Sequence, residues 1–154
     1  MSDQRIAAIT LDERSVVRRS PEIERERATA ISDLLHANRF VPASGCAGPF
    51  NLHLAVEENR LLIDVSGGGA RETIQVGLAP LRRIVKDYFV VCESYYDALR
   101  RHNLSQVEAI DAGRRALHNE GSALLIEQLA GKAEIDHDTG RRLFTLICVL
   151  HLRA

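Results

Sequence analysis

The chain has 154 residues, the length of one ordinary domain, and we expect residues 1–154 to form a single domain. The net charge is −1 and 27% of the residues are charged, so the totals favour neither nucleic-acid binding nor membrane binding. The three cysteines lie far apart and form no CxxC pair. This argues against a disulfide framework or a zinc ribbon and indicates a reducing compartment, so we expect a cytoplasmic protein.

The first half of the chain shows strand signals interrupted by one helix. Residues 5–11 predict a short strand. Ser20 before Pro21 is typical of a helix start, and this helix should end near Asn38. Residues 41–49 predict a loop, because prolines and glycines interrupt them. Alternating apolar and polar residues then predict three neighbouring strands, at residues 50–56, 60–65 and 73–78.

Helical periodicity dominates the second half. Residues 81–101 predict a helix that is apolar on so many sides that it should cross the middle of the core. A capping box beginning at Ser105 predicts the next helix, with a kink or break near Gly121 because glycine is unfavourable inside a helix. A last helix, capped by Asp136 or Asp138, is apolar on almost every side. Such a helix is expected in the core or in a subunit interface.

This order of elements predicts the fold class. Runs of strands followed by runs of helices are typical of α+β proteins. We therefore expect an antiparallel meander sheet of three to four strands packed on one face by about four helices. A doubly wound parallel sheet would require strands and helices to alternate along the chain, and they do not.

The densest group of ionisable side chains lies in the helix that follows Ser105. His118 is the candidate acid or base, because the pKa of histidine lies near neutral pH, and Glu120 or Asp111 would orient it. Arg114 or Arg115 would hold an anionic substrate. The other candidate ligand-binding residues are Asn119, Ser122 and Glu93. The alternative interpretation is a solvated polar stripe held by ordinary ion pairs four residues apart.

The sequence gives little support for a metal or a cofactor. His118 and Glu120 are two residues apart, so their side chains diverge on a helix, and no HExxH motif is present. The glycine-rich turn at residues 66–69 lacks the spacing of a phosphate-binding loop and precedes a strand rather than a helix. We therefore expect no metal and no cofactor.

Three segments of the chain carry a family resemblance. They are RRIVKDYF with CESYY within residues 82–96, IDAGRRALHNEGS at residues 110–122, and RRLFTLICVLH at residues 141–151. On these segments the chain resembles the bacterial uncharacterised protein family 0262 over nearly its whole length. The resemblance implies no assigned activity, so no catalytic residue is carried over from it.

Two functions remain open, and the sequence does not decide whether the protein is an enzyme. The first is an interaction or regulatory protein that forms a homo-oligomer or binds another protein. Its support is the apolar last helix and a small-residue face that would let another helix approach, formed by Ala109, Ala112, Gly113 and Ala116. The alternative is a small-ligand-binding protein or enzyme with an acid/base site at the corner around His118 and Glu120.

Overall fold

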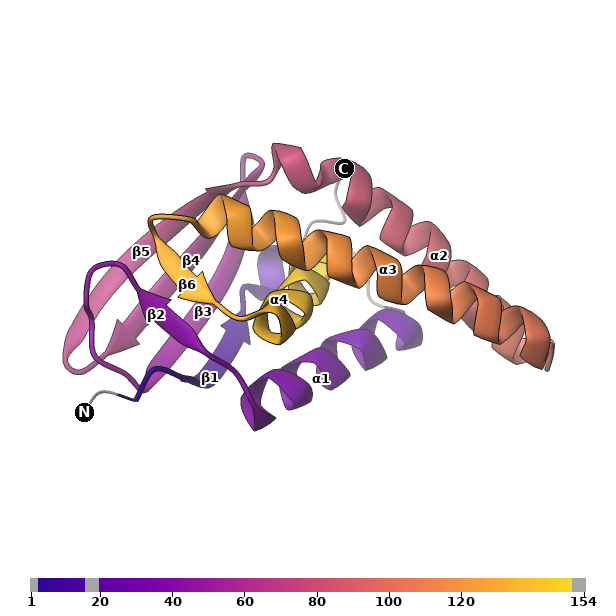
Figure 1. The fold of residues 1–154 in the computed structure, drawn as a ribbon, viewed down its shortest axis with the longest axis horizontal. Helices are drawn as coiled ribbons and strands as arrows, with labels where there is room; N and C mark the ends of the chain where they lie inside the picture. The colour runs from indigo at the N-terminus through magenta and orange to yellow at the C-terminus, as the bar shows by residue number, and fades with distance from the viewer. Residues whose placement is uncertain (1–2, 16–19, 151–154) are drawn as a thin grey trace.

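Strands and helices follow one another in a mixed order in the computed structural model, which describes residues 3–15 and 20–150 (Figure 1). The strands are β1 (Ile6–Leu11), β2 (Phe40–Pro42), β3 (Phe50–Glu57), β4 (Arg60–Gly67), β5 (Ala70–Gly77) and β6 (Ala133–Ile135). The helices are α1 (Pro21–His36), α2 (Arg82–Arg100), α3 (Leu104–Leu129) and α4 (His137–Leu150), with single-turn helices η1 (Glu13–Ser15) and η2 (Ala79–Leu81). The fold is therefore α+β, as the sequence predicts.

The meander forms as expected. Strand β4 pairs antiparallel with β3 and with β5, and these three strands carry the alternating burial that their sequences predict. The turn between β3 and β4 is tight, and both of its central residues, Glu58 and Asn59, have positive φ angles of 49° and 63°. Local patterning identified these strands because each pairs with its neighbour in the sequence.

The prediction of a purely antiparallel sheet is wrong at one edge. The four-stranded sheet has the order β1-β3-β4-β5, and β1 lies parallel to β3. The cause is α1, which follows β1 and returns the chain across the sheet, so that β3 begins at the same end as β1. A strand joined to the sheet through a helix crossover can pair in parallel, whereas the meander prediction considered hairpin connections alone.

A second, smaller sheet forms where the sequence predicted a loop. Strand β2 pairs antiparallel with β6, and Phe40 lies opposite Ile135. Both residues are buried, and Phe40 packs edge-on against Phe50. Each strand has three residues, and its partner lies far away in the sequence, so neither gives a periodic signal of its own.

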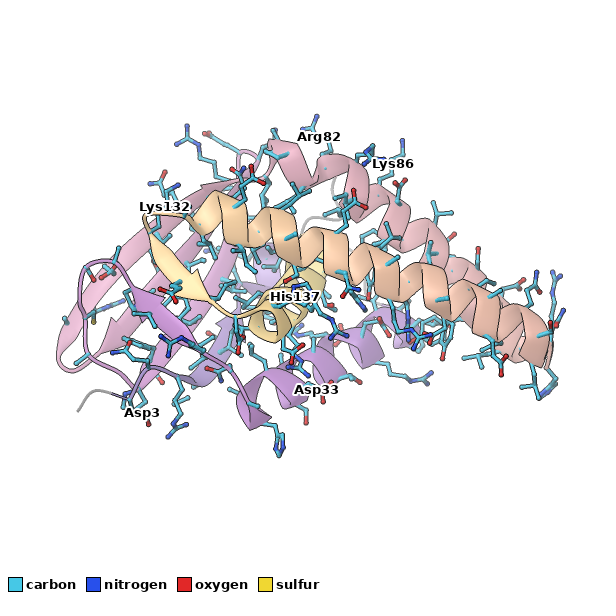
Figure 2. All side chains as sticks on the ribbon, in the orientation of Figure 1. Asp3, Asp33, Arg82, Lys86, Lys132 and His137 are labelled. Atoms are coloured by element: carbon cyan, nitrogen blue, oxygen red, sulfur yellow. The ribbon has the colours of Figure 1, made fainter. Side chains whose placement is uncertain are left out.

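The helices cover one face of the main sheet, and α2 and α3 form a long hairpin that projects beyond it (Figure 1). Helix α2 is one-sided rather than central. Its outer side carries Arg82 and Lys86, which point away from the body of the protein (Figure 2), and Val90 is 60% exposed. The expectation that this helix crosses the middle of the core is therefore wrong.

Helix α4 occupies the centre instead. It packs against α1 and α3, and every residue from Leu143 to Leu150 is buried. Asp136 caps its start, accepting a hydrogen bond from the backbone N–H of Thr139 at 2.9 Å. The apolar surface of α4 that suggested either a core or a subunit interface is thus covered within one chain.

Two expectations about α3 are corrected. The N-cap is Asn103, whose side chain accepts from the N–H of Gln106 at 3.2 Å, and Ser105 lies exposed in the first turn. The helix also continues unbroken through Gly121 to Leu129. A Cβ atom on Gly121 would lie 2.5 Å from the ring of Phe144, so this glycine makes room for α4 and does not interrupt α3.

Candidate functional site

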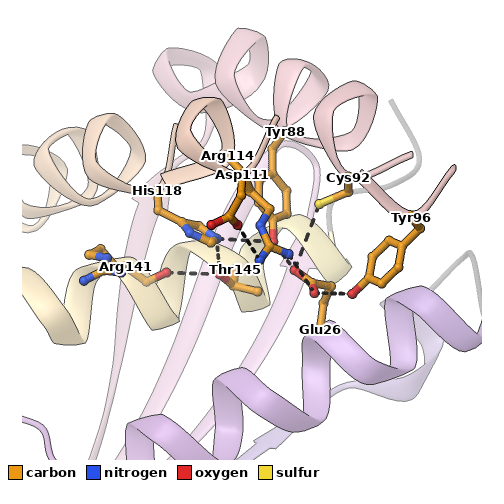
Figure 3. Close-up of polar contacts among 9 residues, drawn as sticks. All are labelled: Glu26, Tyr88, Cys92, Tyr96, Asp111, Arg114, His118, Arg141 and Thr145. Atoms are coloured by element: carbon orange, nitrogen blue, oxygen red, sulfur yellow. Dashed lines mark hydrogen bonds and ion pairs between the residues drawn. The ribbon is translucent and has the colours of Figure 1, made fainter. Parts of the chain in front are cut away.

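Glu26 of α1 is the centre of a polar network enclosed by four helices (Figure 3). Its side chain is 13% exposed. One carboxylate oxygen accepts from the hydroxyl of Tyr88 at 2.6 Å, and the other accepts from the hydroxyl of Tyr96 at 2.6 Å. Tyr88, Cys92 and Tyr96 lie one and two turns apart on the buried side of α2, so all three point towards Glu26.

Arg114 of α3 supplies the positive charge of this network. Its guanidinium donates to Glu26 at 3.3 Å and to Asp111 at 3.0 Å, and it stacks 4.2 Å above the ring of Tyr95. Burial disfavours the guanidinium charge, but Glu26 and the other groups around it hold the pKa of Arg114 above its ordinary value. A carboxylate this sheltered needs its hydrogen bonds complete, and Glu26 accepts from Tyr88, Tyr96 and Arg114.

The hydrogen-bond donors around Glu26 keep their protons at neutral pH. Burial raises the pKa of Tyr88 and of Tyr96 far above the ordinary value for tyrosine, with the Glu26 carboxylate adding to the shift. Burial also raises the pKa of the Cys92 thiol to about 11. These groups therefore bind the carboxylate as neutral donors, and Cys92 is not an activated nucleophile.

His118 joins the network from α3. Its Nε2 lies 3.2 Å from the Tyr88 hydroxyl and 3.2 Å from the Thr145 hydroxyl. Tyr88 donates its own hydrogen to Glu26, and Thr145 donates to the backbone carbonyl of Arg141, so both hydroxyls accept from the ring. Nε2 thus carries the hydrogen, and Nδ1 carries the lone pair. Burial, with Arg114 nearby, lowers the pKa of His118 to about 4, so the ring is neutral at neutral pH.

A cavity of about 530 Å³ lies beside this network, between α1 and α2. Its residues at the start of α1 are Ser20, Glu22, Ile23 and Glu26. Its residues on α2 are Phe89, Cys92, Glu93, Ser94, Tyr96, Asp97 and Arg100. Glu26, Cys92 and Tyr96 belong to both the network and the cavity, so the inner wall of the cavity is the hydrogen-bonded carboxylate.

The structure places some of the candidate residues in the network and others outside it. Asp111, Arg114 and His118 belong to the network, where Asp111 holds Arg114 and the described hydrogen bonds of His118 go to Tyr88 and Thr145. Glu120 and Arg115 lie exposed, with Glu120 paired to Arg83 at 3.3 Å and Arg115 to Asp111 at 3.6 Å.

The remaining candidates have different surroundings. Ser122 is fully buried and donates to the backbone carbonyl of His137 at 2.8 Å, so it ties α3 to the start of α4. Asn119 is exposed and lies 3.2 Å from Nε2 of His137. Glu93 lies on α2 in the wall of the cavity, whereas His118 lies on α3 and does not line the cavity.

Sequence reasoning missed Glu26, Tyr88, Cys92 and Tyr96. Glu26 lies near the N-terminus of α1, where carboxylates are common because the helix dipole favours them. The missed signal is its position, because Glu26 falls on the buried stripe of α1 between Ile23 and Ala30. A carboxylate on a buried stripe requires a partner.

Within residues 3–15 and 20–150, no three histidine, cysteine, aspartate or glutamate side chains gather closely enough to hold a metal ion. The described helices include none that is long and apolar enough to cross a bilayer.

Fold and site together define an α+β protein in which a buried carboxylate network borders a cavity. Residues 3–153 match the uncharacterised protein family UPF0262, and the chain belongs to that family. A UPF0262 protein of Rhodospirillum rubrum is 58% identical over 147 residues, covering 94% of this chain and 91% of the relative. One from Xanthobacter autotrophicus is 51% identical, covering 96% and 92%, and one from Azorhizobium caulinodans is 52% identical, covering 96% and 93%. No solved structure matches the chain.

Proposed function

We propose that this protein binds a small molecule in the cavity between α1 and α2. The observation that carries the proposal is the inner wall of the cavity, where Glu26 is held by Tyr96 and borders the Cys92 thiol. The cavity volume of about 530 Å³ lies within the usual range for small-molecule sites. Ile23 and Phe89 add an apolar side to the polar wall, the mixture that ligand sites commonly show.

We place the site at this cavity rather than at the corner around His118 and Glu120. A general acid or base works best when its pKa lies near the working pH, and the pKa of His118 is about 4. Its Nε2 is shared between Tyr88 and Thr145, and Glu120 pairs with Arg83 instead of orienting the ring. The geometry therefore favours a binding protein over an acid/base enzyme at that corner.

The test is to block the cavity from its rim. Ser94 is exposed on α2, so Ser94→Trp should fill the opening without disturbing the core. Ser32→Trp makes the same change at an exposed position of α1 outside the cavity and serves as the matched control. Native mass spectrometry of each protein, purified from its own host, should show a retained small molecule in the wild type and in the control but not in Ser94→Trp. Equal retention in all three would contradict the proposal.

A second candidate function is homo-oligomerisation through α3, and one observation favours it. Small side chains follow α3 at alternating steps of four and three residues, and all of them are exposed: Ser105, Ala109, Ala112, Ala116, Asn119 and Ala123. Such a seam lets a second helix approach closely. Glu108 and Arg115 flank it seven residues apart, so two antiparallel copies of α3 would place each glutamate beside the partner's arginine.

The three described cysteines are free thiols, which supports a cytoplasmic location for either proposed function.

A charge in the middle of this seam tests the oligomer. Ala112→Arg should lower the assembled mass in sedimentation experiments, because it places an arginine of each copy against the other. Thr29→Arg, at an exposed position of α1, is the control for added charge. A charge at Leu146 or Val149 of α4 would not test the seam, because both residues are buried in the core and the variant would unfold. A mass that Ala112→Arg leaves unchanged would contradict the seam.

A further inference from the structure

We infer that the outer edge of strand β5 is a docking site for an extended acidic segment of a partner protein, which adds to the main sheet as a further strand. Strand β5 is the last in the order β1-β3-β4-β5, and Figure 1 shows it at the rim of the sheet. All of its residues, from Ala70 to Gly77, pair with β4 in one continuous register without a bulge or a proline. A strand this long and regular presents backbone groups with which another chain can pair.

Alternate residues of β5 supply the backbone groups of this edge. The carbonyl of Gln75 faces away from β4, because it accepts from Nζ of Lys132 at 2.9 Å. Bonded and unbonded pairs alternate along an antiparallel ladder, so the N–H and C=O groups of Arg71, Thr73 and Gly77 face the same way. These residues and Gln75 are exposed. The edge thus presents donors and acceptors at the spacing of a strand.

Lysine side chains commonly protect edge strands from pairing, and Lys132 protects this one in part. Of the described side chains, that of Lys132 reaches the backbone of the edge, and it binds the carbonyl of Gln75. An incoming strand would bind this carbonyl itself and release the Lys132 ammonium. An ammonium group only donates hydrogen bonds, so it would then need a new acceptor. A carboxylate on the incoming strand supplies that acceptor.

Two arginines beside the edge also favour an acidic segment. Arg60 extends from β4 and donates to the side chain of Gln75 at 3.2 Å. Arg71 is exposed near the start of β5. A strand rich in carboxylates would lie beside both arginines and Lys132. The β5 edge of a second copy would instead bring the same three cations against them, and like charges repel.

The carboxylates of β4 and β5 do not cancel this preference, because both already accept hydrogen bonds. Glu72 lies on the same side of β5 as the buried Ile74 and accepts from the hydroxyl of Ser44. Asp64 lies one strand further in, on β4, and accepts from the hydroxyl of Thr73 at 2.8 Å. The positive side chains are therefore the charged groups that a strand added at this edge would meet first.

The test uses a synthetic peptide of about eight residues that alternates glutamate with valine, a pattern suited to a strand. It is added to the full chain at low salt, and hydrogen exchange of backbone amides is followed by NMR. The amides of Arg71, Thr73, Gln75 and Gly77 should become protected. The amides between them are already bonded to β4 and should change little. This alternation distinguishes strand addition from binding elsewhere, and a peptide with lysine in place of glutamate should bind about tenfold more weakly.

A proline in the middle of β5 tests whether the backbone makes the contact. Thr73→Pro removes an N–H from the outer edge and leaves the ladder with β4 intact, because proline is tolerated where the N–H faces solvent. It should abolish binding of the acidic peptide. Thr73→Ala is the matched control, because it loses the same side-chain bond to Asp64 but keeps the N–H, and it should bind as the wild type does.

A charge variant tests the preference for an acidic strand. Arg71→Gln should weaken binding of the acidic peptide about threefold at low salt. Arg101→Gln makes the same change at the end of α2, away from the sheet, and should leave binding unchanged.

A peptide methylated at alternate backbone nitrogens keeps its charge and loses donors, so it should not bind, and it tests the backbone contact on the unaltered protein. Equal binding of the methylated or the lysine peptide would overturn the proposal, as would unchanged binding by Thr73→Pro or no binding of the acidic peptide. Protection of the same amides in the protein alone, rising with protein concentration, would show that a second copy covers the edge and would also overturn it.

Discussion

The inward and outward sides of α3 belong to one helix and have opposite physical roles. Arg114 and Arg115 are neighbours in the sequence, yet the side chain of Arg114 is 18% exposed and that of Arg115 is 64% exposed. Arg114 binds Glu26 and Asp111, whereas the ion pair described for Arg115 is a longer one to Asp111, at 3.6 Å. Residue type alone therefore does not mark a site, because the direction in which the helix presents the side chain decides whether it is buried and paired.

Gly121 and Gly113 of α3 also differ in whether they face inward or outward. Gly121 lies against the ring of Phe144, while a Cβ atom on Gly113 would have no described neighbour within 4 Å. The first is needed for the close packing of α3 on α4. The second costs helix stability with no visible packing benefit, and it lies on the exposed side beside the small-residue seam.

The largest difference in the free energy of unfolding is expected between variants of Arg114 and Arg115. Arg114→Ala leaves the sheltered Glu26 carboxylate without its cation and should lower the free energy of unfolding by about 3 kcal/mol. Arg115→Ala removes an exposed ion pair and should change it by less than about 0.5 kcal/mol. Urea denaturation of both variants checks this, and similar losses in the two would show that the network has no special role in stability.

The second largest loss of stability is expected when a methyl group is added to Gly121, the glycine that faces inward. Gly121→Ala places a carbon within 2.6 Å of three ring atoms of Phe144, so the ring or the helix must move. Overpacking of this kind should lower the free energy of unfolding by about 2–3 kcal/mol. Thermal unfolding measures the loss, and Gly121→Ala combined with Phe144→Leu should recover part of it. No loss in the single variant would mean that α3 and α4 pack less tightly than described.

His118 should make stability depend on pH. Its pKa is about 4 in the folded chain and 6.5 in the unfolded chain, so the unfolded chain binds the proton more strongly between these values. The free energy of unfolding should therefore fall by about 2 kcal/mol as the pH is lowered from about 7 to about 5. His118→Gln keeps a donor towards Tyr88 and Thr145 and should lack this component. Parallel pH profiles of the variant and the wild type would contradict the assignment.

The smallest effect belongs to the outward glycine and has the opposite sign. Gly113→Ala should raise the free energy of unfolding by up to about 1 kcal/mol, because alanine favours the helix and the position is open. The same thermal unfolding experiment measures it. A destabilised Gly113→Ala would indicate that another surface, such as a second copy of α3, already occupies this space. Repeating the measurement across protein concentrations distinguishes that case.

Local patterns predicted much of the fold. Ser20 and Pro21 marked the start of α1 because capping depends on adjacent residues alone, and Ser20 accepts from the N–H of Ile23 as expected. The meander strands were predicted because hairpin partners are close in sequence. The errors occurred where the pairing of a strand depends on an element far away in the sequence. Strand β1 pairs in parallel with β3 through a helix crossover, and β2 pairs with β6, which lies near the other end of the chain.

The candidate site was predicted only in part. Asp111, Arg114 and His118 were singled out as a dense ionisable group, and the structure places all three in one network. Glu26, the centre of this network, lies 62 residues before Tyr88 and 88 residues before Arg114 in the sequence. A contact between residues so far apart depends on how whole helices pack, and helical periodicity does not contain that information.

The sequence by itself determined the α+β class, the family and the positions of the helices along the chain. These follow from hydrophobic periodicity and capping, which act over a few residues. Only the tertiary structure decided which side of α3 faces inward, that Gly121 serves packing, and that Glu26 meets two tyrosines and an arginine beside a cavity. The physical reason is that burial, charge pairing and pKa shifts depend on every element packed around a group, whatever its distance along the chain.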